Sequence, residues 1–150
     1  MTTRTGKCLC GAVSYVVTEG RDDFGICHCK MCQRWTGSMF PGIVYRADQV
    51  AVVGSDSVTE YRSSEKATRS FCKHCGSTLW YRGAAPGHDE PYYEIAVGTL
   101  DQTEGLVLTH EIFVDRKPEA WALAGEHVRD TEADYLRKVA EARVKREAGA

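Results

Sequence analysis

Seven cysteines carry most of the chemical reactivity of this sequence, and they lie in short clusters. They occupy positions 8, 10, 27, 29, 32, 72 and 75, so each has a neighbour two or three residues away. Such spacings let a single turn direct two sulfurs at one ion. In a reducing compartment they indicate metal ligands or redox thiols rather than disulfides. Zinc fits best, because it favours thiolate ligands and needs no redox chemistry.

The seven thiols divide naturally into three and four. Cys27, Cys29 and Cys32 supply three sulfurs within six residues, and three thiolates leave one corner of a tetrahedral zinc open for chemistry. The other four can close a structural zinc: Cys8, Cys10, Cys72 and Cys75. Spacing alone leaves two other four-ligand sets open: Cys29 and Cys32 with Cys72 and Cys75, or Cys8 and Cys10 with Cys27 and Cys29. Both zincs can also be purely structural, with water or His28 in the open corner.

Length and composition limit the class of protein. The 150 residues suit one domain, and 43% hydrophobic with 27% charged residues is ordinary for a globular protein. A formal net charge of -2 argues against a nucleic-acid binder. No apolar run approaches the roughly 18 residues that span a bilayer. The first seven residues lack the apolar core of a signal peptide, so we expect no membrane partner and a cytoplasmic location.

Runs of β-branched and aromatic residues between short turns predict a mainly β sandwich or barrel. The expected strands cover 12–18, 24–27, 39–45, 49–53, 58–62, 66–71, 77–82, 92–97 and 106–114. Pro41 and Gly42 lie inside one of them and predict an edge strand or a bulge there. Residues 30–35 fit one short helical turn, and 83–91 fit a loop.

The C-terminal segment has a different character. Thr131 can cap a helix, and Tyr135, Leu136, Val139 and Ala142 follow at helical spacing. Basic residues lie near its C-terminal end, where the helix dipole favours positive charge. We therefore predict a helix over 131–147. It packs on the sandwich or frays as a tail, and an oligomer contact is the less favoured alternative.

Four blocks of the sequence together resemble one known family. They are Gly6–Val13, Cys27–Gly37, Phe71–Leu79 and His110–Lys117, the last followed by Trp121. These blocks are similar to the glutathione-dependent formaldehyde-activating enzyme (GFA) family, whose domain also occurs in centromere protein V. The resemblance spans residues 4–122 and implies an Mss4-like, zinc-binding, antiparallel β-sandwich. Residues 123–150, the C-terminal helix and tail, lie outside it.

The resemblance also implies ligand sets and a reaction. By similarity, Cys8, Cys10, Cys72 and Cys75 hold a structural zinc, while Cys27, Cys29 and Cys32 hold a catalytic zinc. The implied enzyme is a carbon–sulfur lyase of the S-(hydroxymethyl)glutathione synthase type. Its partners are a small thiol such as glutathione and a small aldehyde such as formaldehyde. An open three-thiolate zinc suits this chemistry, because it can bind a thiol and lower its pKa, or polarise a carbonyl.

The last block departs from the family pattern, because Glu111 stands between His110 and the Ile112–Phe113 pair. We therefore give His110 no catalytic role and predict a strand histidine near the surface. His28 lies between two ligands, and strand alternation predicts that it points away from the metal.

Several residues near the clusters can serve the site or simply the fold. The basic ones are Lys30, Arg34, Arg69 and Lys73, and the aromatic ones are Trp35, Phe40, Trp80 and Tyr81. The basic side chains can neutralise carboxylates of a peptide thiol. Solvated charge, or charge that offsets the thiolates, is the favoured interpretation for each of them. For the aromatic side chains the favoured place is the core.

Two other functions remain open at this point. A zinc-stabilised interaction module without catalysis is the first alternative, although no long basic or proline-rich extension supports it. A redox or metal-handling protein that uses Cys27, Cys29 and Cys32 as thiols is the second.

Overall fold

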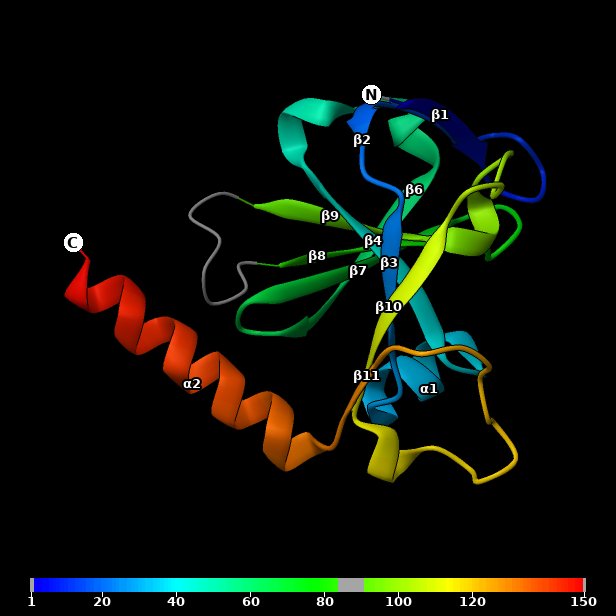
Figure 1. Cartoon of the computed structure of the whole chain (residues 1–150). Coiled ribbons are helices and arrows are strands. Elements are labelled where there is room, and N and C mark those ends of the chain that lie inside the picture. The colour runs from blue at the N-terminus through cyan, green and yellow to red at the C-terminus, as the bar shows by residue number, and fades with distance from the viewer. Residues whose placement is uncertain (1, 84–90, 150) are drawn as a thin grey trace.

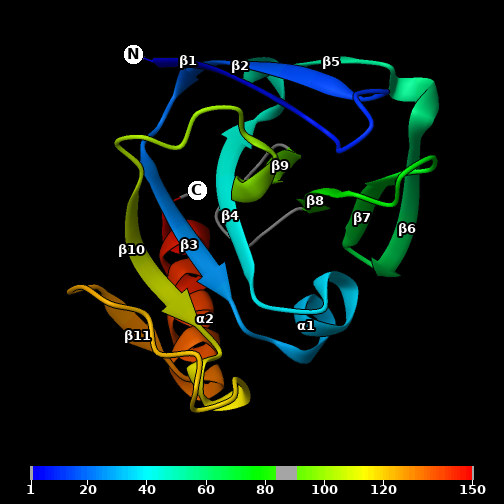
Figure 2. The ribbon, with the colours of Figure 1, turned by 90° about the vertical axis from the view of Figure 1, so that its right-hand side faces the viewer.

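Two β-sheets form the body of the protein, as Figure 1 shows for this computed structural model, which describes residues 2–83 and 91–149. The small sheet has the order β1-β2-β5, and the large sheet has the order β11-β10-β3-β4-β9-β8-β7-β6. The strands of the small sheet are β1 (Thr2–Lys7), β2 (Ser14–Gly20) and β5 (Val50–Val53). In Figure 2 the small sheet runs along the top of the molecule.

The large sheet contains the remaining strands, and the helices follow or interrupt them. Its strands are β3 (Asp23–Cys27), β4 (Phe40–Arg46), β6 (Val58–Ser64), β7 (Ala67–Cys72), β8 (Thr78–Gly83), β9 (Tyr92–Ala96), β10 (Val107–Ile112) and β11 (Val128–Asp130). The α-helices are α1 (Lys30–Thr36) and α2 (Glu132–Ala148). Four 3-10 turns complete the described chain: η1 (Ala47–Gln49), η2 (Ser55–Ser57), η3 (Val97–Thr99) and η4 (Val114–Arg116).

The core lies where the small sheet covers one face of the large sheet. Strand alternation places Tyr15 of β2 and Ile43 of β4 in this core, both essentially buried. Tyr15 meets Trp80 of β8 edge to face, with ring centroids 6.1 Å apart. The same alternation turns Gly42 and Val44 of β4 to the opposite face of the large sheet. We call that opposite face of the large sheet the site face.

Most expected strands are confirmed within one or two residues, but their pairing is only partly antiparallel. β10 pairs in parallel with β3 and with β11. Neither β1 nor β11 was expected from the sequence, because both are short on apolar residues. The loop expected over 83–91 lies largely outside the described residues, which leave out 84–90.

The prediction of an edge strand or bulge at Pro41 is wrong, because β4 lies inside the sheet between β3 and β9. Pro41 pairs with Ile26 of β3, whereas pairing with β9 begins only at Gly42. The missing amide donor of Pro41 can therefore face the end of β9, where no ladder hydrogen bond is lost.

The predicted helix over 131–147 is confirmed as α2, with a capping box at its start. The Thr131 side chain accepts a hydrogen bond from the Asp134 amide, and Asp134 accepts one from the Thr131 amide in return. No side chain of α2 is fully buried, and the helix runs outward from β11 (Figure 1). Neither described helix is both long and apolar enough to cross a membrane.

Gly54 lies in the connection between β5 of the small sheet and β6 of the large sheet, and substituting it tests how tightly this connection packs. It follows β5 in the left-handed region at φ +81°, and a Cβ there would lie 2.0 Å from the backbone oxygen of Ala12. Gly54→Ala should lower the free energy of unfolding by about 2–5 kcal/mol, because strain and backbone overlap add together. Urea unfolding measures this change.

Gly105→Ala is the matched control, because Gly105 also has a positive φ but has open space around it. It should cost only the about 1–2 kcal/mol of left-handed strain. Equal losses for the two variants would contradict the close contact at Ala12.

Candidate metal centres and the adjoining site face

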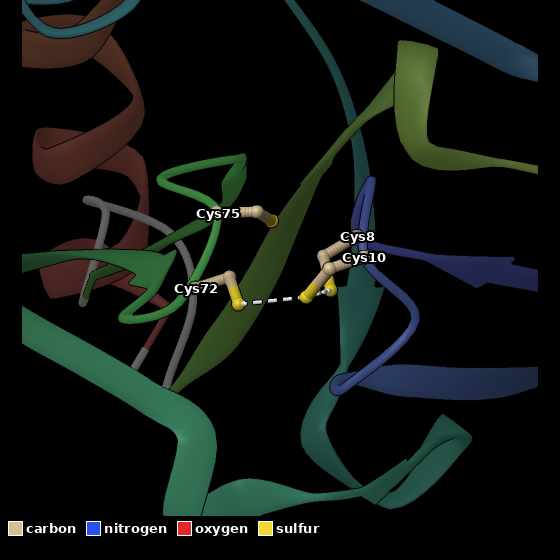
Figure 3. Close-up of side chains that lie close together, drawn as sticks. All are labelled: Cys8, Cys10, Cys72 and Cys75. Atoms are coloured by element: carbon tan, nitrogen blue, oxygen red, sulfur yellow. Dashed lines mark hydrogen bonds between the residues drawn. The ribbon is translucent and has the colours of Figure 1, made fainter.

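Four cysteine side chains from two segments that are distant in the sequence converge in the folded protein (Figure 3). Cys8 and Cys10 follow β1, and Cys72 and Cys75 lie at the turn from β7 to β8. The sulfur of Cys10 lies 3.6 Å from that of Cys8 and 3.8 Å from that of Cys72. A tetrahedral zinc with Zn–S bonds of about 2.3 Å requires sulfurs roughly 3.8 Å apart. The four sulfurs, which all lie within 4.8 Å of one another, are therefore suited to a closed zinc site.

Each of the two segments turns tightly after its cysteine pair. Gly11 and Gly76 both take a left-handed conformation, with φ of +79° and +74°. Their amides donate to the carbonyls of Cys8 and Cys72, respectively, which closes each turn. Only a residue without Cβ takes this conformation cheaply, so the two glycines form the turns that aim the sulfurs.

The second group consists of Cys27, Cys29 and Cys32, whose sulfurs all lie within 4.8 Å of one another. Cys27 ends β3, and Cys29 is the N-cap of α1, where its sulfur accepts a hydrogen bond from the Cys32 amide. The strand end and the first helical turn therefore bring three sulfurs together locally. Among the described residues this group has three members, whereas the other has four. Three sulfurs can hold a metal ion and leave one position for another ligand.

The charges of these three sulfurs depend on one another. Hydrogen bonds from Cys27 and then Cys32 lower the pKa of Cys29 well below its usual range. Hydrogen bonding to Cys29 is the main cause that raises the pKa of Cys27, and burial adds to it. Hydrogen bonding within the group thus favours ionisation of Cys29 over ionisation of Cys27. A divalent cation would allow all three to ionise, with release of protons.

Arg69 is the positive charge that faces this group. It is 5% exposed, and its Nη1 donates to the Cys32 sulfur at 3.5 Å. Its guanidinium lies 5.0 Å from the ring centre of Trp35 and 5.3 Å from that of Tyr81. The two rings hold the cation over the sulfur in a low-dielectric setting, where it offsets thiolate charge.

A buried ionic network holds the other side of the cysteine segment. Glu111 is fully buried and accepts hydrogen bonds from His28 at 2.6 Å and His127 at 2.5 Å, with Arg129 at 3.3 Å. Burial by itself would raise the pKa of Glu111, but the hydrogen bonds from His127 and His28 outweigh it and lower that pKa. His28 lies between two ligand positions, so this network fixes the backbone from which the cysteines extend.

The surroundings of the cysteines confirm some sequence predictions and extend others. His28 points to Glu111 and is outside the cysteine group, and His110 is an exposed residue of β10, as expected. Of the flanking cations, Arg69 is buried beside the sulfurs, while Lys30, Arg34 and Lys73 are exposed. Phe40 and Trp80 are buried, whereas Trp35 and Tyr81 are half-buried around Arg69.

Sequence reasoning missed Glu111, His127 and Arg129 as a unit, because β10 and β11 meet only in the folded sheet. The one available signal was the unexpected position of Glu111 in its block. Glu94 of β9 pairs with Tyr81, which in turn pairs with Arg69, so its side chain lies on the same face of the sheet. Sequence reasoning missed it, because a single glutamate in a predicted strand is typical of a surface residue.

The chain is similar to proteins of one known family. The profile of the glutathione-dependent formaldehyde-activating enzymes matches residues 3–116, which is most of the sequence. The chain belongs to the GFA family. An uncharacterized lyase of Schizosaccharomyces pombe is 29% identical over 121 residues, which cover 81% of this chain and 85% of the yeast protein. GFA membership and this relative together support a lyase.

The fold is shared with a solved structure. A crystal structure of a Rhodobacter sphaeroides protein superposes with a TM-score of 0.54 at 25% identity, covering 83% of this chain and 98% of that one. The expected mainly β GFA-type fold with a C-terminal helix is thus confirmed. In this chain, the cysteine-containing blocks that resemble the GFA family are the segments that form the two sulfur groups.

The buried network makes a quantitative prediction. Glu111→Ala leaves His28 and His127 without their acceptor inside the protein, so it should lower the free energy of unfolding by about 3–5 kcal/mol. Urea unfolding at neutral pH measures the change. Glu119→Ala, an exposed control, should shift it by less than about 0.5 kcal/mol. If the two variants were equally stable, the network would not hold the segment as described.

Proposed function

We propose that this GFA protein is a zinc-dependent carbon–sulfur lyase that forms or cleaves S-hydroxymethyl adducts. The substrates are a small thiol of the glutathione type and a small aldehyde of the formaldehyde type. The single observation that carries the proposal is the incomplete three-sulfur group beside a buried arginine. Such a group suits a reactive metal site, whereas a closed four-sulfur group suits a structural one.

In this proposal each cysteine group has its own ion. Cys27, Cys29 and Cys32 hold the catalytic zinc, and Cys8, Cys10, Cys72 and Cys75 hold the structural zinc. The catalytic zinc, when bound, supplies an open coordination position that lowers the pKa of a substrate thiol. The structural zinc ties the segment after β1 to the turn between β7 and β8.

The chain's own residues prepare the place where the substrates meet. Arg69 offsets the negative charge of the sulfurs, so an anionic thiol can approach a site that is otherwise repulsive. Trp35 and Tyr81 hold the Arg69 guanidinium in place and keep water from one side of it. The aldehyde carries no charge and needs only a small space next to the thiol. The expected cytoplasmic location, where such thiols are reduced and abundant, remains a prediction.

The two zinc sites predict different losses on substitution. The purified protein should contain about two zinc ions per chain, and Cys29→Ser should keep one and remain folded. Cys72→Ser should also lose one ion but with a large drop in melting temperature, because the structural zinc contributes directly to folding. Metal analysis and thermal unfolding measure both effects. A wild-type chain with one ion, or equal melting temperatures for the two variants, would contradict the division of roles.

The proposed reaction can be followed directly by NMR exchange spectroscopy with glutathione and formaldehyde. The zinc-loaded protein should accelerate exchange between free glutathione and its S-hydroxymethyl adduct above the spontaneous rate. Cys29→Ser should return the rate to the spontaneous one, because the third sulfur of the catalytic group is lost. Full zinc loading without acceleration would refute the enzyme and favour the alternative, a zinc-stabilised interaction module. A protein partner recovered in stoichiometric amount would then support that module.

A further inference from the structure

A cavity of about 370 Å³ lies between the site face and helix α2. Its sheet wall includes Val44, Glu94 and Ile112, and its helix wall includes Tyr135 and Val139. Ile112 of β10 pairs directly with Cys27 of β3, so one end of the cavity lies next to the three-sulfur group. In Figure 2, α2 passes behind β3 and β10, and residues of both α2 and β10 line this space. A substrate held at the sulfurs can therefore extend into the cavity.

Glu94 is placed to act in this space. It pairs with Tyr81 of β8, and Tyr81 pairs with Arg69 of β7, so the three side chains form one row across the site face. The same row thus joins the carboxylate to the arginine that touches Cys32. Among the described residues, none donates a hydrogen bond to the Glu94 carboxylate or forms an ion pair with it. A carboxylate of this kind, facing a cavity, is free to engage a ligand.

Gly42 explains how the carboxylate reaches over the middle of the sheet. A Cβ at position 42 would lie 2.6 Å from Glu94 Cγ and 2.7 Å from its Oε1. The side chain of Glu94 therefore occupies the space that the missing side chain of Gly42 leaves. Its direction is toward β3, the strand that ends at Cys27.

The groups around Glu94 set its proton affinity. Those that line the cavity with it are Tyr92, His110, Asp130, Tyr135 and Lys138. Asp130 and Lys138 form an ion pair at 2.7 Å and largely cancel each other. Burial raises the pKa of Glu94 to about 7, against an opposing effect of Arg69 and with a smaller contribution from Cys29. A group with such a pKa can both take and give a proton near neutral pH.

We propose that Glu94 is a catalytic residue that carries the thiol proton to the carbonyl oxygen while the carbon–sulfur bond forms. This inference rests on the proposed lyase function. The S–H bond breaks and its proton goes to the Glu94 carboxylate. The sulfur electron pair then forms the C–S bond, the C=O π pair moves to oxygen, and that oxygen takes the proton from Glu94. Atoms and charge balance without another reactant, and the reverse sequence cleaves the adduct.

The test compares Glu94→Gln with Glu60→Gln, an exposed residue of β6 in the same sheet. Exchange spectroscopy with glutathione and formaldehyde should show that Glu94→Gln loses about 100-fold or more of the protein-dependent rate, with unchanged zinc content. Glu60→Gln should keep the wild-type rate. If the wild type is active and Glu94→Gln stays within about threefold of it, the role of Glu94 is refuted while the lyase stands. If the wild type gives no acceleration, the proposed lyase fails, and this role fails with it.

Stability as a function of pH gives a readout that does not depend on activity. The folded pKa of Glu94 lies above the unfolded value of 4.5, so the folded state binds more protons between these values. Wild-type stability should therefore fall as pH rises from about 4.5 to about 7, and Glu94→Gln should lack this part of the fall. In urea unfolding of the zinc-loaded proteins, the midpoint of the variant should rise relative to wild type from pH 5 to pH 8. A constant difference would show that Glu94 does not exchange its proton in this range, which would overturn the proposal.

Discussion

Negative charge on closely spaced sulfur is the constraint on which the rest of this structure depends. Cys27, Cys29 and Cys32 crowd three ionisable thiols within 4.8 Å at the end of β3. Burying such a group in an apolar layer costs free energy unless positive charge or hydrogen bonds offset the thiolate charge. Arg69 supplies one positive charge from inside the sheet, and a bound cation can supply the rest. The rings of Trp35 and Tyr81 contact the Arg69 guanidinium and hold its positive charge near the sulfurs.

A second set of hydrogen bonds anchors the cysteine segment to its neighbours in the sheet. His28 is tied through Glu111 to His127, and the His28 amide also donates to the Ile112 carbonyl. These bonds come from β10 and from the residue that precedes β11, and the two strands join the sheet in parallel at one edge. The parallel edge therefore has a clear physical role. It delivers a buried carboxylate to the back of the cysteine segment, where an antiparallel hairpin neighbour would present a different register.

Local sequence patterns predict many of the secondary-structure elements. They do not predict features that depend on which strands pair in the folded sheet. Alternation and turn residues predicted most strands, and the Thr131 cap predicted α2, because these signals act within a few residues. The cysteine spacing and the GFA resemblance predicted both sulfur groups. The central place of β4 escaped prediction, since Pro41 is tolerated only because β9 stops beside it. Glu94 escaped for a similar reason, because its environment is made by Gly42, Arg69 and α2, which are remote in sequence. The split into domains at residue 122 stays a prediction.

The order of these segments along the chain has a consequence for how the protein matures on the ribosome. The C-x-C-x-x-C segment emerges early and can capture an ion by itself, because its three sulfurs lie within six residues. The four-cysteine group must wait for residue 75, and closing that long loop costs more chain entropy. The groups that shelter the early segment arrive later still, with Arg69, Glu111 and His127. Until those residues emerge, the three thiols lack the partners that surround them in the folded protein, and an ion bound at this stage would protect them from oxidation.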